Sequence, residues 1–184
     1  MTKIIKKTVP KRRNCSPNFL DSCTPNAYFQ LQNITHLILT AMIKITDKSI
    51  DVQKVIETAS SLAAGAVNVF IGTVRNTAHN KNVVWLEYEA YESMAVAETR
   101  KIIDEAAHKW PLLGWAVSHR VGTLKPGEVA VAVAVSTRHR KESFQACEFI
   151  IDQLKEKVPL FKKEVFEDGE EWVGAHPKVS PNLN

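Results

Sequence analysis

The sequence predicts a single α+β domain, with a mainly antiparallel sheet and helices packed on one face of it. Helical and strand-like segments follow one another in the order β-α-β-β-α-β-β-α-β. The turn LKPG (124–127) joins two strand-like runs as a hairpin, which favours antiparallel pairing. A helical segment that starts at His139 breaks at Pro159 into a short strand, so helix and strand form one unit at the end of the domain.

The first half of the predicted domain contains one helix and three strands. The predicted elements are a strand at 42–45, a helix at 51–64, a strand at 66–75, a polar and mobile loop at 76–82, and a strand at 83–90. Gly65 follows the helix as a stop signal. The run AVNVFIGTVR has the character of a buried strand, and it ends in Arg75.

The second half contains two longer helices. Its predicted elements are a helix at 91–109, strands at 115–122 and 128–137, a helix at 139–158, a strand after Pro159 and one more strand-like piece past Glu164. Pro111 ends the first of these helices. The second carries its apolar residues at helical spacing, and Cys147 lies among them.

Two polar tails flank the predicted domain of residues 42–177. Residues 1–41 contain three prolines and six basic residues against one acidic residue, which predicts a poorly ordered basic extension. This composition resembles part of a transit peptide, but no amphipathic arginine-rich helix is present. The alternative that we favour is a natural start at Met42. Residues 178–184 form a second polar tail.

The composition narrows the possible classes of protein. A hydrophobic content of 45% and a charged content of 24% are typical of a soluble globular protein, and no apolar run reaches membrane-spanning length. The net charge of +4 comes from the extension, since residues 42–184 carry 18 basic and 19 acidic residues. This balance argues against a broad nucleic-acid-binding face. The three cysteines form no metal-like or disulfide pattern, which favours free thiols in a reducing compartment.

Cationic residues at the two ends of the 139–158 helix suggest a site for an anion. His139 and Arg140 lie at its N-terminus, where unpaired N–H groups favour an anion. Lys155 lies in its last turn, Lys162 follows Pro159, and each of these residues could also be a hydrated surface charge. If the helix folds back on its sheet, these residues and Arg75 can line one pocket.

Strand alternation places Lys162 and Glu164 on the same face of the last strand, where they can form an ion pair or act on one ligand. Glu87 and Glu89 also share a strand face, but a glycosidase needs its two acids on opposite sides of a bond, so salt bridging is the better interpretation. His119 has the pattern of a core histidine. No phosphate-binding glycine loop, nucleophile elbow or zinc spacing occurs, and we therefore expect no cofactor and no metal.

Seven short motifs together resemble the large, catalytic subunit of molybdopterin synthase over residues 42 to 176. These motifs are FIGTVR (70–75), LEYEAY (86–91), HRVG (119–122), KPGE (125–128), HR (139–140), AC (146–147) and LKEKVPLFKKE (154–164). The family often has tryptophan where this chain has Phe161, which is still aromatic. The resemblance implies the α/β hammerhead fold of that family and says nothing about residues 1–41.

The resemblance also implies a reaction, its partners and its location. Family members insert two sulfurs into cyclic pyranopterin monophosphate and so make the dithiolene of molybdopterin. Each sulfur arrives as a thiocarboxylate on the C-terminal Gly-Gly of a small ubiquitin-like carrier subunit. The implied assembly is a heterotetramer built on a homodimer of large subunits, in the cytoplasm, without nucleic acid or membrane.

The matching positions give the expected site residues. They are Thr73, Val74, Arg75, His139, Arg140, Lys155, Lys162, Lys163 and Glu164. Our hypothesis is that the arginines and His139 hold the substrate phosphate, that Lys155 positions the thiocarboxylate, and that Lys162 moves a proton while Glu164 orients it. Two alternatives remain: a non-catalytic module that binds a ubiquitin-like protein, and a nucleic-acid-binding protein that acts through its basic N-terminus.

Overall fold

The structure is a computed structural model that describes residues 40–173. The predictions for residues 1–39 and for the tail at 178–184 lie outside the described residues. The first strand begins at Thr40, two residues before the predicted start of the domain. Within residues 40–173, no helix is long and apolar enough to span a membrane, and no group of acidic, histidine or cysteine side chains could hold a metal ion.

One of the two sheets has four strands, and we call it the large sheet because it carries the main core. Its order is β1 (Thr40–Thr46), β5 (Gly114–Arg120), β7 (Val129–Thr137) and β2 (Ala66–Thr73). β1 pairs with β5 in parallel, whereas the β5–β7 and β7–β2 pairs are antiparallel, which confirms a mainly antiparallel sheet. β2 was predicted to be a buried strand, but it lies at an edge and is only partly buried.

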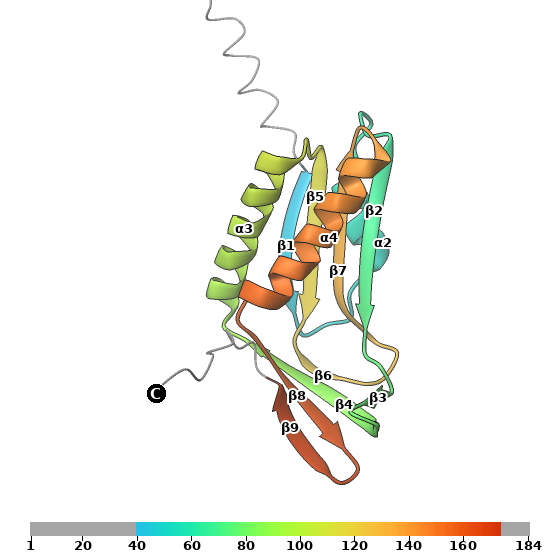
Figure 1. Cartoon of the computed structure of the whole chain (residues 1–184), viewed down its shortest axis with the longest axis vertical. Helices are drawn as coiled ribbons and strands as arrows, with labels where there is room; N and C mark the ends of the chain where they lie inside the picture. Colours follow the sequence, from blue (N-terminus) through green and yellow to red (C-terminus); the bar gives the residue numbers. More distant parts are fainter. Residues whose placement is uncertain (1–39, 174–184) are drawn as a thin grey trace, which may run out of the picture. The chain divides into compact units, whose positions relative to one another are not determined.

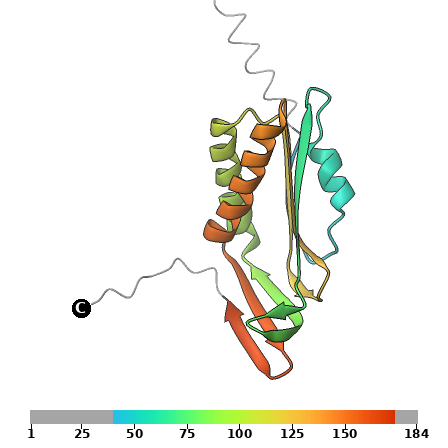
Figure 2. The same cartoon turned by 45° about the vertical axis from the view of Figure 1, so that its right-hand side comes forward.

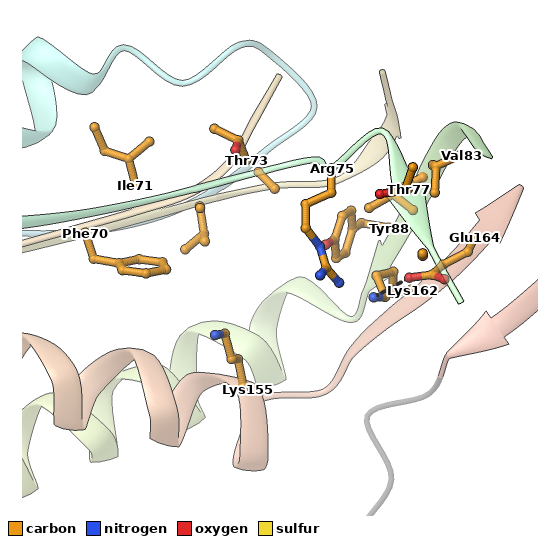
Figure 3. Close-up of a pocket in the computed structure, with 15 residues that line it drawn as sticks. Phe70, Ile71, Thr73, Arg75, Thr77, Val83, Tyr88, Lys155, Lys162 and Glu164 are labelled. Carbon is orange, nitrogen blue, oxygen red and sulfur yellow. Dashed lines mark hydrogen bonds and ion pairs between the residues drawn. The ribbon is translucent and has the colours of Figure 1, made fainter. Parts of the chain in front are cut away.

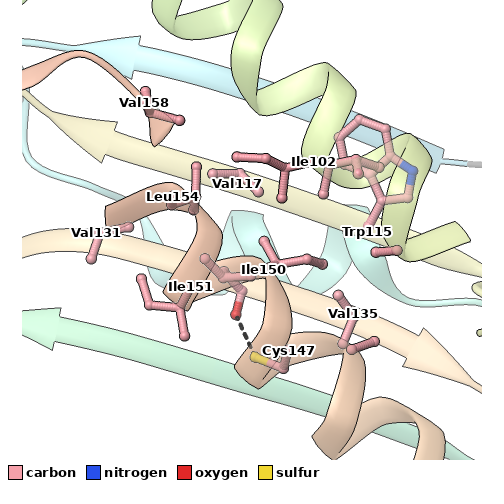
Figure 4. Packing of buried hydrophobic residues seen from close by; sticks show 14 of the residues in the cluster. Ile102, Trp115, Val117, Val131, Val135, Cys147, Ile150, Ile151, Leu154 and Val158 are labelled. Carbon is pink, nitrogen blue, oxygen red and sulfur yellow. Dashed lines mark hydrogen bonds between the residues drawn. The ribbon is translucent and has the colours of Figure 1, made fainter. Parts of the chain in front are cut away.

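Two long helices cover one face of this sheet, namely α3 (Glu92–Lys109) and α4 (Arg140–Lys157) (Figures 1 and 2). Their apolar residues pack against side chains of β5 and β7, such as Trp115 and Val133, and form the main core. Figure 4 shows this packing, in which the Cys147 thiol lies 3.9 Å from the Val133 carbonyl oxygen. Burial raises the pKa of the Cys147 thiol to about 11, which agrees with its predicted place on the apolar face of the helix.

The first helix, α2 (Val52–Ala59), lies on the opposite face of the sheet, which corrects the expectation that all helices share one face (Figure 2). Val55 and Ala59 pack there against three alanines of β5 and β7. These small side chains leave room for the helix to approach closely. The helix is also shorter than predicted, because the Ser60 hydroxyl donates to the Ile56 carbonyl at 2.7 Å and the chain then turns extended.

A second sheet of five strands, which we call the small sheet, extends beyond the end of the large one (Figure 1). Its strands are β3 (Thr77–Ala78), β4 (Lys81–Ala90), β6 (Gly122–Leu124), β8 (Leu160–Phe166) and β9 (Gly169–Val173). The predicted mobile loop at 76–82 forms the β3–β4 hairpin instead. His79 and Asn80 form its turn with positive φ angles of 52° and 61°, a conformation typical of two-residue hairpins. A separate apolar cluster, which includes Leu86, Leu124 and Phe166, joins this sheet to the end of the large one.

Candidate functional site

A cavity of about 410 Å³ opens where the end of the large sheet, the last turn of α4 and the small sheet meet (Figure 3). We call it the main cavity. Its charged lining residues come from three separate segments: Arg75 after β2, Lys155 on α4, and Lys162 with Glu164 on β8. Three cations therefore face one carboxylate, so the main cavity favours an anionic ligand.

Backbone contacts fix the chain where β2 ends. The pairing of β2 with β7 shifts register between Gly72 and Thr73. Val74 then forms two backbone hydrogen bonds with the 127–128 turn. Its N–H donates to the Glu128 carbonyl at 3.0 Å, and its carbonyl accepts from the Gly127 N–H at 2.8 Å. The Val74 side chain is buried in the small apolar cluster. Thr73 and Arg75 line the main cavity, as alternation along the chain requires.

Arg75 and Lys155 are available to a ligand. The Arg75 side chain extends into the main cavity (Figure 3), and it forms no ion pair with any residue between 40 and 173. The Lys155 Nζ lies 5.6 Å from the centroid of the Phe70 ring and likewise has no carboxylate partner in the described part of the chain. Two cations without counter-ions in one cavity indicate a site for negative charge.

Lys162 and Glu164 form an ion pair, which is one of the two arrangements expected from their place on the same strand face. The Lys162 Nζ lies 2.8 Å from Glu164 Oε1, and the Glu164 side chain is only 5% exposed. Glu164 Oε2 is buried without a hydrogen-bond partner, and the Nε2 atom of His79 lies 3.9 Å from it. A buried carboxylate of this kind holds the Lys162 ammonium in place at the wall of the main cavity.

Lys163 faces away from the main cavity. Its Nζ lies 2.8 Å from Glu87 Oε2 and 3.5 Å from Glu170 Oε2, and it also lies 5.2 Å from the centroid of the Trp172 ring. The hydrogen bond with Glu87 raises the pKa of Lys163. The predicted salt-bridging role of Glu87 is thereby confirmed, and Lys163 joins three strands on the outer face of the small sheet.

His139 and Arg140 lie far from the other predicted site residues. They begin α4, whereas Lys155 lies in its last turn, and a helical rise of 1.5 Å per residue separates the two ends by about 22 Å. Neither residue lines the main cavity. One chain therefore does not bring the predicted histidine–arginine pair and the two lysines together.

Tyr88 and His119 also line the site, although neither was among the site residues expected from the sequence. A second cavity of about 270 Å³, the side cavity, adjoins the main one and shares Tyr88, Val131, Lys155 and Lys162 with it. Strand alternation places Tyr88 on the face opposite Glu87, and this pattern could have identified Tyr88 as a candidate site residue. The pairing of Tyr88 with Lys162 of β8 could not be predicted from residue spacing.

His119 is buried and neutral at the side cavity, as a core histidine would be. Its Nδ1 lies 2.9 Å from the Arg120 carbonyl oxygen, so Nδ1 carries the proton and Nε2 is an acceptor. Burial lowers the pKa of His119 to about 4. This residue adds an acceptor, and no charge, to a wall that is otherwise mostly apolar.

Comparisons with known proteins agree on the fold and the family. The family model described as MoaE protein matches residues 45–157. The molybdopterin synthase catalytic subunit of Bacillus subtilis (strain 168) is 43% identical over 147 residues, which cover 77% of this chain and 94% of that protein. The crystal structure of molybdopterin synthase from Staphylococcus aureus superposes with a TM-score of 0.69 and 39% identity, covering 71% of this chain and 96% of that chain.

A complex of subunits 1 and 2 of the molybdopterin-converting factor from Helicobacter pylori 26695 shares the fold. It superposes with a TM-score of 0.59 and 20% identity, over 72% of this chain and 89% of that one.

Proposed function

The chain belongs to the MoaE protein family, which gives it a role in molybdenum cofactor biosynthesis, and from this premise we propose that it transfers sulfur to cyclic pyranopterin monophosphate. The sulfur comes from the thiocarboxylated C-terminus of a small ubiquitin-like carrier subunit, and the product is the dithiolene of molybdopterin. The Helicobacter pylori complex of two subunits supports a small-subunit partner.

The observation that carries the proposal is the convergence of Arg75, Lys155 and Lys162 on one cavity, whose lining among residues 40–173 contains a single carboxylate. The substrate carries a phosphate and the carrier tail carries a thiocarboxylate, so both bound groups are anions. Charge-assisted hydrogen bonds from an arginine to a phosphate are about twice as strong as neutral ones. A cavity with two cations in excess suits both groups.

The positions of the residues in the cavity suggest a separate role for each of them. Arg75 holds the phosphate, with Thr73 beside it and Val74 fixing the end of the strand. Lys155 positions the thiocarboxylate and stabilises the negative charge that develops during transfer. Lys162, which Glu164 holds at 2.8 Å, donates or accepts a proton on the pterin.

A homodimer formed through β2 can supply the predicted roles of His139 and Arg140. β2 is an edge strand with unpaired backbone groups, and it exposes the apolar residues Val67 and Ile71. In a twofold antiparallel β2–β2 pairing, the Ala66 end of one copy lies beside the Thr73 end of the other. Ala66 pairs with Thr137, which lies two residues before His139 and whose hydroxyl donates to the His139 carbonyl at 2.7 Å. The second copy would therefore bring His139 and Arg140 to the cavity.

The test is calorimetric binding of cyclic pyranopterin monophosphate in the absence of any carrier. Wild-type protein binds it, and Arg75→Ala weakens binding by about tenfold or more, since hydrogen bonds to charged groups contribute about 1.5–3 kcal/mol. Lys157→Ala is the control, because it also removes one cation. Lys157 lies in the same last turn of α4 as Lys155, but it pairs with Glu105 at the surface and does not line the main cavity. If the wild type binds the carrier and not the pterin, the chain is a binding module instead of an enzyme.

A further inference from the structure

We propose that Tyr88 is a further substrate-contacting residue, whose hydroxyl donates a hydrogen bond to an anionic oxygen of a bound substrate where the main and side cavities meet. This inference rests on the proposed function and adds to it a residue that lies within the LEYEAY motif but was not among the expected site residues. The acceptor is either a phosphate oxygen of the pterin or the thiocarboxylate oxygen of the carrier tail, and both have the same hydrogen-bonding chemistry.

The position of Tyr88 in the sheet places it among the cations of the site. Tyr88 is the cross-strand partner of Lys162 in the β4–β8 pair, and cross-strand neighbours on one face lie about 5 Å apart. Tyr88 lines both cavities, as do Lys155 and Lys162. Figure 3 shows the Tyr88 ring between the Arg75 side chain and Lys162. A ligand that contacts these cations therefore passes within reach of the phenol.

The Tyr88 side chain is half-buried, and its hydroxyl has no protein hydrogen-bond partner among residues 40–173. Burial and, to a smaller extent, the nearby Glu164 carboxylate raise the pKa of Tyr88, so the phenol stays protonated at neutral pH. A neutral donor that opens into a cavity is suited to an acceptor brought by a ligand.

Contacts with the protein hold the ring without a ligand. The ring centroids of Tyr88 and His119 lie 5.2 Å apart with an interplanar angle of 72°, an edge-to-face arrangement. His119 is itself fixed by its contact with the Arg120 carbonyl oxygen. Tyr88 also packs against the apolar cluster that joins the two sheets. Because the ring is held in advance, the hydroxyl binds an oxygen without a further ordering cost.

The chemistry around Tyr88 selects the class of ligand group. Arg75, Lys155 and Lys162 only donate hydrogen bonds, and the Glu164 carboxylate, the one acidic group among the described residues that line the main cavity, is already paired with Lys162. The missing partner for all of these donors is an oxygen-rich anion. Tyr88 contributes a hydrogen-bond donor without adding charge. The cations attract the anion, and the Tyr88 hydroxyl helps to orient it.

The experiment compares Tyr88→Phe, which removes only the hydroxyl and keeps the ring contacts, with Tyr91→Phe. Tyr91 is 67% exposed, precedes α3 and lines neither cavity, so it is the matched control. Calorimetry measures binding of cyclic pyranopterin monophosphate, of inorganic phosphate and, separately, of the thiocarboxylated carrier. We expect Tyr88→Phe to weaken at least one of these by about tenfold. Loss for the pterin and phosphate assigns the phosphate oxygen, and loss for the carrier alone assigns the thiocarboxylate.

Dissociation constants within twofold of wild type for all three probes would overturn the proposal. Tyrosine ¹³Cζ NMR on the wild type gives a second measurement that does not depend on the stability of a variant. The chain has only three tyrosines, so the Tyr88 signal can be assigned, and it should shift when the binding probe is added. If wild-type protein binds phosphate and Tyr88→Phe does not, but no molybdopterin forms in the complete system, the proposed function fails while the Tyr88 contact stands.

Discussion

The burial of Glu164 explains why a lysine is fixed at the wall of the main cavity. A carboxylate that is 5% exposed would be costly without a cation, and the ion pair with Lys162 at 2.8 Å provides that cation. Since the pair lies at the cavity wall, the carboxylate fixes both the place and the charge of the lysine. The role that we propose for Lys162 therefore depends on Glu164.

Glu164→Gln should lower the turnover number by about tenfold or more and change KM little, because general acid–base groups contribute about 10²–10⁴-fold when correctly placed. The substitution keeps the shape of the side chain and removes its charge. Steady-state kinetics with the carrier and the pterin measure both constants. Glu87→Gln is the matched control, since Glu87 pairs with Lys163 on the outer face of the same sheet. Equal turnover for both variants would remove Glu164 from the mechanism.

His119 should make the folded protein less stable in acid. Its pKa in the folded state, about 4, lies below its ordinary value of 6.5. Between these two values the unfolded chain takes up a proton that the native state does not, so the free energy of unfolding decreases as pH falls from 6.5 to 4, by about 3 kcal/mol in total. Urea unfolding across this pH range measures the decrease.

His119→Gln should remove most of this dependence on pH, whereas replacing the exposed His108 in the same way should leave it unchanged. If the His119→Gln curve kept the wild-type slope, the neutral state assigned to His119 would be wrong.

Residue-level pattern predicted part of this site. The alternation after Pro159 was enough to pair Lys162 with Glu164, and the cationic character of Arg75 and Lys155 was also recognised. Tyr88 was missed because its importance depends on which residue of β8 lies opposite it. That register is set by the tertiary structure, and no local pattern contains it.

At the scale of helices and strands, the sequence predicted which elements exist and of what type they are better than it predicted where they lie in the fold. The apolar stripe of the first helix shows that one side is buried but not which face of the sheet receives it. A further signal was present: β5 and β7 are buried along nearly their whole length, as expected for strands covered on both faces. The near-continuous apolar run of residues 129–135 therefore already implied helices on both sides.

The edge strand β2 gives a prediction about assembly. Val67→Asp should shift the dimer–monomer equilibrium toward the monomer by at least about tenfold, because a charge on an apolar edge strand opposes strand pairing. Analytical ultracentrifugation measures this shift. Val84→Asp is the matched control, since Val84 is exposed to a similar degree, 38% against 41%, but lies in the small sheet. Equal effects of the two substitutions would exclude β2 as the interface.

At the scale of the whole molecule, the length of α4 limits which of the expected site residues one chain can bring together. About 22 Å of helix separates Arg140 from Lys155, and we propose that a second copy supplies His139 and Arg140 to the cavity. The sequence identified cationic residues as candidates for the site, but a list of residues from one chain does not show whether two chains share a site.

Subunit mixing tests this shared site. Arg140→Ala and Lys155→Ala should each be nearly inactive alone, because each removes a cation from every site of a homodimer. After mixing and exchange of subunits, half of the heterodimers' sites are intact, so activity should return to about a quarter of wild type. Mixing Lys155→Ala with Lys162→Ala should restore no activity. Both lysines line the cavity of one chain, so every site of that heterodimer lacks one of them. Failure of the first mixture to recover would contradict a site that takes Arg140 from one chain and Lys155 from the other.

The most direct test of the central claim is a single-turnover assay with cyclic pyranopterin monophosphate and thiocarboxylated carrier. The dithiolene product is detected as its oxidised fluorescent derivative. We predict that wild-type protein and Lys157→Ala form product at similar rates, and that Lys155→Ala and Lys162→Ala form it at least about a hundredfold more slowly. Turnover near wild type in both of the last two variants would contradict the account, because the cations of the main cavity would then have no part in the reaction.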